Sequence, residues 1–135
     1  MTVVTGRILV VEDDDALRET LAEVMADEGH EVRAAMHGAD ALQALASWTP
    51  DVIVLDLMMP IMDAYEFRAH QRQTPGGLHA RVLVLSAARG VPDAAARLEA
   101  DAWLTKPFAL ADVIAAVDRL LDGADPATRP EASLA

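Results

Sequence analysis

The sequence predicts an α/β protein with a doubly wound, five-stranded parallel sheet. Apolar runs rich in β-branched residues alternate with stretches of helical spacing, five times along the chain. Three of the runs are apolar almost throughout, which is typical of parallel strands that helices cover on both faces. The predicted strands lie at residues 7–11, 32–36, 51–56, 81–86 and 102–106.

Between these strands, apolar residues recur at the spacing of an α-helix. The clearest stripe, near the N-terminus, consists of Leu17, Leu21, Val24 and Met25, and a second runs through residues 109–122. Weaker stripes predict the remaining helices. The predicted helices lie at residues 15–28, 38–48, 63–73, 92–100 and 109–122.

The length and composition of the chain limit its domain organisation and the classes of function it can have. At 135 residues, the chain can bury one core, and we expect a domain at 1–123 followed by a flexible tail or linker at 124–135. The absence of cysteine excludes disulfides, thiol catalysis and cysteine-bound zinc, and favours the cytoplasm. A formal net charge of −11 argues against direct nucleic-acid contact. The N-terminal segment has the pattern of neither a signal peptide nor a spanning helix, so we expect no membrane association.

Polar residues follow the predicted strands at their carboxyl ends, where ligands bind in sheets of this class. Glu12 and Asp13 follow the first strand, Asp56 ends the third, Ser86 the fourth and Lys106 the fifth. Three acids in one place repel one another unless a cation lies among them or some of them are protonated. Because the ligands are oxygen atoms, Mg²⁺ is the expected ion, with Mn²⁺ or another divalent ion as an alternative.

Each of these residues taken singly has an ordinary structural interpretation. An Asp at a strand end is usually a turn former or a helix cap, and Asp14 and Asp15 suit that role because they precede a predicted helix. Their joint placement favours a chemical role, because the three acids, the hydroxyl and the amine lie on four different strands at the same edge of the predicted sheet. Four histidines show no ligand spacing and are predicted to lie on the surface: His30, His37, His70 and His79.

Four segments carry a resemblance to a known family. ILVVEDD, VIVLDLMMPIMD, VLVLSA and WLTKPF stand in the order and spacing of the receiver domain of two-component response regulators, the chemotaxis-type signalling domain. The chain resembles this family over a core at residues 7–121. The resemblance implies a flavodoxin-like (βα)5 fold with strand order 2-1-3-4-5.

The resemblance also implies a phosphoacceptor site. Asp56 would accept a phosphoryl group from a sensor histidine kinase or a histidine phosphotransfer protein. Glu12, Asp13, Asp56 and the backbone carbonyl of Met58 would bind Mg²⁺. The domain would promote its own phosphorylation and slow dephosphorylation only, and would not be an enzyme acting on other substrates.

Other positions would respond to the phosphoryl group and transmit the signal. Ser86 and Lys106 would contact it, and the peptide bond before Pro107 would be cis. Movement of Ser86 would admit the aromatic Trp103, which reshapes the face at residues 92–122 for a downstream protein. The resemblance leaves open whether phosphorylation also produces a homodimer.

Several positions depart from the family pattern. Ala64 and Glu99 stand where Gly is usual. At Ala64 a positive φ would cost about 1 kcal/mol or shift the loop. At Glu99 the left-handed helix end is either strained or absent, and we expect that segment to be mobile or shifted. Trp103 is bulkier than the usual Tyr or Phe, so the switch could be partial or non-standard. Met58 and Ala88 cannot hydrogen-bond an attacking water from their side chains, which predicts slow loss of phosphate.

The leading hypothesis is therefore a stand-alone receiver that signals through protein contacts. One alternative is a degenerate receiver that binds partners without phosphorylation. Another is an aspartyl-nucleophile phosphohydrolase, which Met58 disfavours because such enzymes place an acid two residues after the nucleophile. A flavin-binding module is set aside, because the acids at 12–15 would repel phosphate.

Overall fold

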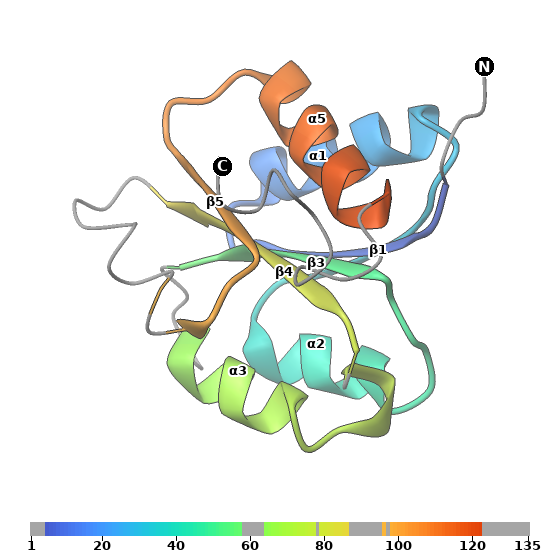
Figure 1. Cartoon of the computed structure of the whole chain (residues 1–135), viewed down its shortest axis with the longest axis vertical. Helices are drawn as coiled ribbons and strands as arrows, with labels where there is room; N and C mark the ends of the chain where they lie inside the picture. The colour runs from blue at the N-terminus through green and yellow to red at the C-terminus, as the bar shows by residue number, and fades with distance from the viewer. Residues whose placement is uncertain (1–4, 58–63, 78, 87–95, 97, 123–135) are drawn as a thin grey trace.

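The computed structural model describes residues 5–57, 64–77, 79–86, 96 and 98–122 (Figure 1). Its centre is a parallel sheet of five strands in the order β2-β1-β3-β4-β5, which confirms the predicted fold class and strand order. The strands are β1 (Arg7–Val11), β2 (Glu31–Ala35), β3 (Val52–Asp56), β4 (Arg81–Ser86) and β5 (Ala102–Thr105).

Helices cover both faces of the sheet, with α1 and α5 on one side and α2 and α3 on the other (Figure 1). Most of the predicted helix at 92–100 lies outside the described residues, although Ala96 and Leu98 are helical. Within the described part of the chain, no helix is long and apolar enough to cross a membrane. The described helices are α1 (Asp15–Asp27), α2 (Gly38–Leu45), α3 (Ala64–Gln71) and α5 (Leu110–Asp122), with a 3-10 turn, η1, at Pro75–Gly77.

The core is divided by the sheet into two apolar clusters. Successive strand residues point to opposite faces, so Leu9 of β1 packs toward α2 and α3 whereas Ile8 packs toward α1 and α5. All residues of β3 are buried, which agrees with its continuous apolar sequence. Trp48 lies in the cluster that faces α2 and α3, and its indole Nε1 donates to Glu31 Oε2 at 2.8 Å.

The helix ends differ from prediction by at most three residues, and the largest difference is at the end of α2. Asp14 caps α1 by accepting the Leu17 amide, as expected. Helix α2 ends at Leu45 rather than at residue 48. Pro50 disfavours helical backbone at the residue before it, and the chain leaves the helix so that Trp48 can enter the core.

The prediction that all four histidines lie on the surface is wrong for His30. This residue is buried, and its Nδ1 accepts the backbone amide of Gly6 at 3.2 Å. His37 is half-buried and caps α2 by accepting the Asp40 amide through Nδ1. His70 and His79 are exposed, as predicted. The polar residues next to His30 in the sequence gave no sign of its tertiary contact.

Of the two positions where the family usually has Gly, Ala64 is unstrained. It is the first residue of α3, and its side chain is fully buried in the cluster that faces α2 and α3. Glu99 is the one described residue other than Gly with positive φ, at 56°. Of the outcomes that were left open, the strained left-handed backbone occurs at Glu99 and not at Ala64.

Arg68 of α3 and Arg72, which directly follows this helix, hold the strained end of the helical segment before β5. Arg68 donates from Nε to the Leu98 carbonyl at 2.8 Å and from Nη2 to the Glu99 carbonyl at 2.9 Å. Arg72 Nη2 pairs with Glu99 Oε1 at 2.6 Å. The carbonyl groups that a helix end leaves unpaired thus find donors on a neighbouring helix.

Glu99→Gly is expected to be more stable than Glu99→Ala by about 1 kcal/mol, because Gly adopts positive φ without steric cost. Both variants lose the ion pair with Arg72, so their difference isolates the backbone strain. The free energies of unfolding in urea give the comparison. Equal stabilities of the two variants would contradict the strain.

Candidate functional site

Three carboxylates meet at the carboxyl ends of β1 and β3, which are neighbours in the sheet. Glu12 and Asp13 follow β1, and Asp56 is the last residue of β3. One oxygen atom from each lies within 4.8 Å of the others. Glu12 and Asp56 are buried, whereas Asp13 is exposed. The sheet therefore brings together the three acids that the sequence placed at this edge.

Lys106, the only lysine of the chain, lies beside these acids. Its Nζ is 3.6 Å from Glu12 Oε1 and 4.0 Å from Asp56 Oδ1. The Lys106 amide donates to the Ser86 carbonyl at 2.9 Å, which ties the end of β5 to the end of β4. The peptide bond between Lys106 and Pro107 is cis, as the resemblance implied.

Ser86 completes the row of polar residues at this edge. It is fully buried and is the last residue of β4. Asp56 pairs with Leu85 in the register of β3 and β4, so Ser86 is one residue further toward the edge. The five residues predicted for the site therefore follow four strands at the same edge, in agreement with their placement in the sequence.

The proximity of the acids changes their protonation. Burial, followed by the neighbouring Asp56 carboxyl, raises the pKa of Glu12 to about 8, against the opposing effect of the Asp14 amide. That amide donates to Glu12 Oε2 at 3.1 Å. For Asp13, burial alone would raise the pKa, but hydrogen bonding with Glu12 and Asp56 outweighs it and lowers the pKa. Glu12 thus tends to hold a proton at neutral pH while Asp13 is ionised.

The donor set fits a hard divalent cation. Glu12 Oε1 is buried and, within the described residues, has no hydrogen-bond partner, although Lys106 lies near it. Buried carboxylate oxygens without a donor are costly unless a cation compensates them. Carboxylate oxygens are ligands that Mg²⁺ prefers. The backbone carbonyl predicted at Met58 lies outside the described residues, as does Ala88.

Trp103 lies on β5, away from the edge of the sheet where the acids meet. It pairs with Val84 in the sheet, two residues before Ser86. Ala102 and Leu104 pack against the cluster that faces α1 and α5, so Trp103 belongs to the opposite face, where 44% of it is exposed. Its role as a switch stays a prediction.

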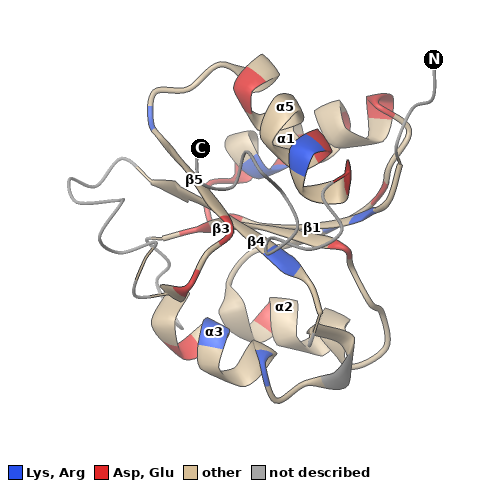
Figure 2. Ribbon diagram, viewed as in Figure 1, with Lys and Arg blue, Asp and Glu red and all other residues tan. Residues whose placement is uncertain are grey.

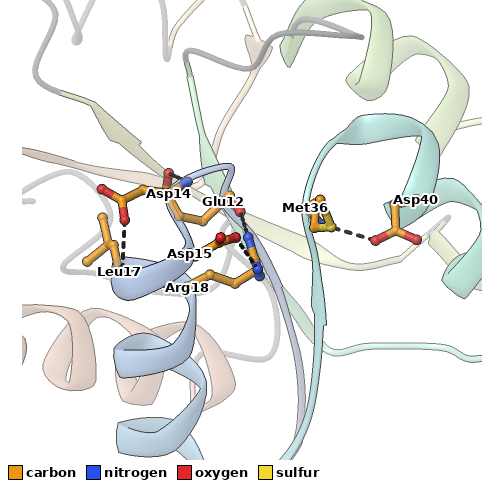
Figure 3. Close-up of polar contacts among 7 residues, drawn as sticks. All are labelled: Glu12, Asp14, Asp15, Leu17, Arg18, Met36 and Asp40. Carbon is orange, nitrogen blue, oxygen red and sulfur yellow. Dashed lines mark hydrogen bonds and ion pairs between the residues drawn. The ribbon is translucent and has the colours of Figure 1, made fainter.

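Arg18 is a residue at the site that sequence reasoning missed. Its Nη1 donates to the backbone carbonyl of Glu12 at 3.0 Å, and its Nη2 pairs with Asp15 Oδ1 at 2.6 Å (Figure 3). The spacing of Asp15 and Arg18 on one helix could have indicated the ion pair. The contact with the Glu12 carbonyl depends on the turn between β1 and α1, which the sequence pattern does not define.

Comparison with known proteins identifies the family. The profile of the response regulator receiver domain matches residues 8–118. The chain belongs to the response regulator receiver family. Response regulator MprA from Mycobacterium sp. (strain KMS) is 40% identical over 127 residues, which cover 93% of this receiver chain but 54% of that protein. The chain thus spans about half the length of the curated relatives that it matches.

Solved structures agree with the receiver fold. Chemotaxis response regulator CheY4 of Vibrio cholerae is 27% identical with a TM-score of 0.79, and the match covers 87% of this chain and 99% of that one. The receiver domain of a sensor histidine kinase from Pseudomonas aeruginosa is 21% identical with a TM-score of 0.79, and the match covers 88% of this chain and 99% of that one. At this identity the likeness supports the fold alone. That neighbour has a magnesium ion coordinated in its active-site cleft.

Proposed function

We propose that this receiver domain accepts a phosphoryl group on Asp56 from a histidine kinase or a phosphotransfer protein. The observation that carries the proposal is the group of three carboxylates within 4.8 Å, with the Lys106 amine 4.0 Å from Asp56 Oδ1. A carboxylate beside a fixed cation is suited to attack phosphorus, because the cation offsets charge on the transferring oxygens.

The transfer is a balanced exchange of one bond to phosphorus for another. A carboxylate oxygen of Asp56 forms the new O–P bond while the P–N bond to the donor histidine breaks. The electron pair of that bond stays on the imidazole nitrogen, which takes up a proton. Lys106 is placed to stabilise the negative charge, since its Nζ faces both Asp56 and Glu12. The product is an aspartyl phosphate.

Glu12, Asp13 and Asp56 would hold Mg²⁺, or Mn²⁺ in its place. When bound, the ion would neutralise charge on the acids and on the phosphoryl oxygens. Glu12 Oε1, which is buried and accepts no hydrogen bond from the described residues, and the all-oxygen donor set support this assignment. The magnesium ion in the Pseudomonas aeruginosa receiver domain is in keeping with it.

The output of the domain would be a change in its protein contacts. Ser86 would contact the phosphoryl group, Trp103 would respond on β5, and the face at residues 92–122 would bind a downstream protein or a second copy. We further propose that the domain works in the cytoplasm and does not turn over other substrates. That it acts alone stays a prediction, because the curated relatives extend beyond the matched half.

Intact mass after incubation with Mg²⁺ and a small phosphodonor such as acetyl phosphate tests the proposal. We expect a gain of one phosphoryl group in the wild type and none in Asp56→Asn. No gain with any donor or kinase would favour the degenerate receiver. Rapid turnover of many phosphoesters, without a stable adduct, would favour the phosphohydrolase.

A further inference from the structure

Arg18 turns back from α1 toward the end of β1 rather than into solvent. Its side chain is 14% exposed. The guanidinium spans two acceptors, the Glu12 carbonyl at 3.0 Å and the Asp15 carboxylate at 2.6 Å (Figure 3). A planar fork of donors with a fixed charge suits such a bridge, which a lysine could make only in part.

The bridge closes a turn in which hydrogen bonds hold the residues on both sides of Asp13. Glu12 is fixed at both ends, because the Asp14 amide donates to its carboxylate and Arg18 donates to its carbonyl. Asp14 in turn accepts the Leu17 amide with its side chain and the Arg18 amide with its carbonyl. Asp13 lies between these anchored residues, so the same turn sets the position from which its carboxylate reaches the others.

We propose that Arg18 is a positioning residue for the cation site: it holds the turn at residues 12–15 in the shape that gathers Glu12 and Asp13 beside Asp56. This inference rests on the proposed Mg²⁺ site. Arg18 acts through the backbone of Glu12 and through Asp15, and touches neither the ion nor the phosphoryl group. Outer partners of this kind orient the residues that bind a metal.

The positioning role and the charge of Arg18 have opposite effects on Mg²⁺ affinity. Removal of a cation near three carboxylates, and release of Asp15 from its ion pair, make the local potential more negative and should tighten binding of a dication. Loss of the turn geometry should weaken it. The sign of the change in Arg18→Met therefore separates the two effects.

Titration calorimetry with MgCl₂ measures the affinity in the full chain. We expect Arg18→Met to bind Mg²⁺ about tenfold more weakly than the wild type, and Arg18→Lys to lie between them. Arg33→Met is the matched control, because it removes the same charge from an exposed side chain stacked over Trp48, where the guanidinium is 4.8 Å from the ring centroid. Affinity in Arg18→Met that equals or exceeds that of the wild type would overturn the proposal.

Hydrogen exchange of the metal-free protein gives a second measurement. The Asp14 amide should exchange faster in Arg18→Met, whereas the Val54 amide in the centre of the sheet should be unchanged. Faster exchange at both amides would indicate general destabilisation and would overturn the positioning role. If Arg18→Met does not fold, Arg18→Lys and Asp15→Asn take its place in both measurements. Absence of Mg²⁺ binding in the wild type would contradict the proposed function. The exchange rate of the Asp14 amide in Arg18→Met would then show whether Arg18 holds the turn.

Discussion

Lys106→Met is expected to slow phosphorylation of Asp56 by about 10²–10³-fold, the usual cost of removing one fixed group that stabilises a transition state. The Lys106 Nζ lies 4.0 Å from Asp56 Oδ1 and 3.6 Å from Glu12 Oε1, so it faces the place where the transferring oxygens would collect charge in the proposed reaction. The rate of mass gain with acetyl phosphate and saturating Mg²⁺ gives the measurement.

The same substitution should leave Mg²⁺ binding unchanged or make it tighter, because it removes a positive charge beside the acids. A slower transfer with undiminished Mg²⁺ affinity would assign Lys106 to the transfer step rather than to the metal site. Lys106→Arg, which keeps the charge in a different shape, should retain part of the rate. A wild-type rate in Lys106→Met would remove this residue from the mechanism.

Mg²⁺ affinity is expected to rise about tenfold per pH unit below pH 8 and to level off above it. Burial and the nearby Asp56 raise the pKa of Glu12 to about 8, so the ion must displace a proton at neutral pH. The lowered pKa of Asp13 keeps that ligand ionised throughout this range. Affinities at pH 6 and pH 8 should therefore differ about 50-fold, because about half of the Glu12 carboxyls still hold the proton at pH 8.

Glu12→Gln should bind Mg²⁺ more weakly and lose most of this pH dependence. The raised pKa also affects folding without metal: the native state holds the Glu12 proton more tightly than the unfolded chain, whose carboxyl titrates near 4.5. Stability of the metal-free wild type should thus fall as pH rises from about 4.5 to about 8. An Mg²⁺ affinity independent of pH would show that Glu12 is not a proton-binding ligand.

The site residues that stand at the carboxyl ends of strands could be predicted from the sequence. Glu12, Asp56, Ser86 and Lys106 each follow an apolar run, and carboxyl ends of parallel strands share one edge. The strand order followed from the family resemblance. The left-handed backbone at Glu99 was one of two outcomes that the family resemblance left open, since the cap could be strained or absent.

Tertiary contacts of single side chains could not be predicted. Arg18 reaches a backbone carbonyl across a turn, and nothing in its neighbours on α1 specifies that acceptor. His30 is buried because Gly6, distant in sequence, donates to its ring. Ala64 is helical, in agreement with the predicted helix at 63–73, but the departure from the usual Gly had left a positive φ at this position open.

The most direct measurement for the central claim is the location of the phosphoryl group after reaction with Mg²⁺ and a phosphodonor. Hydroxylamine attacks an aspartyl phosphate and marks the residue as a hydroxamate, which peptide mass spectrometry can assign. The account predicts one modified residue, Asp56, and no modification in Asp56→Asn. A phosphoryl group found on another residue, or retained in Asp56→Asn, would contradict it.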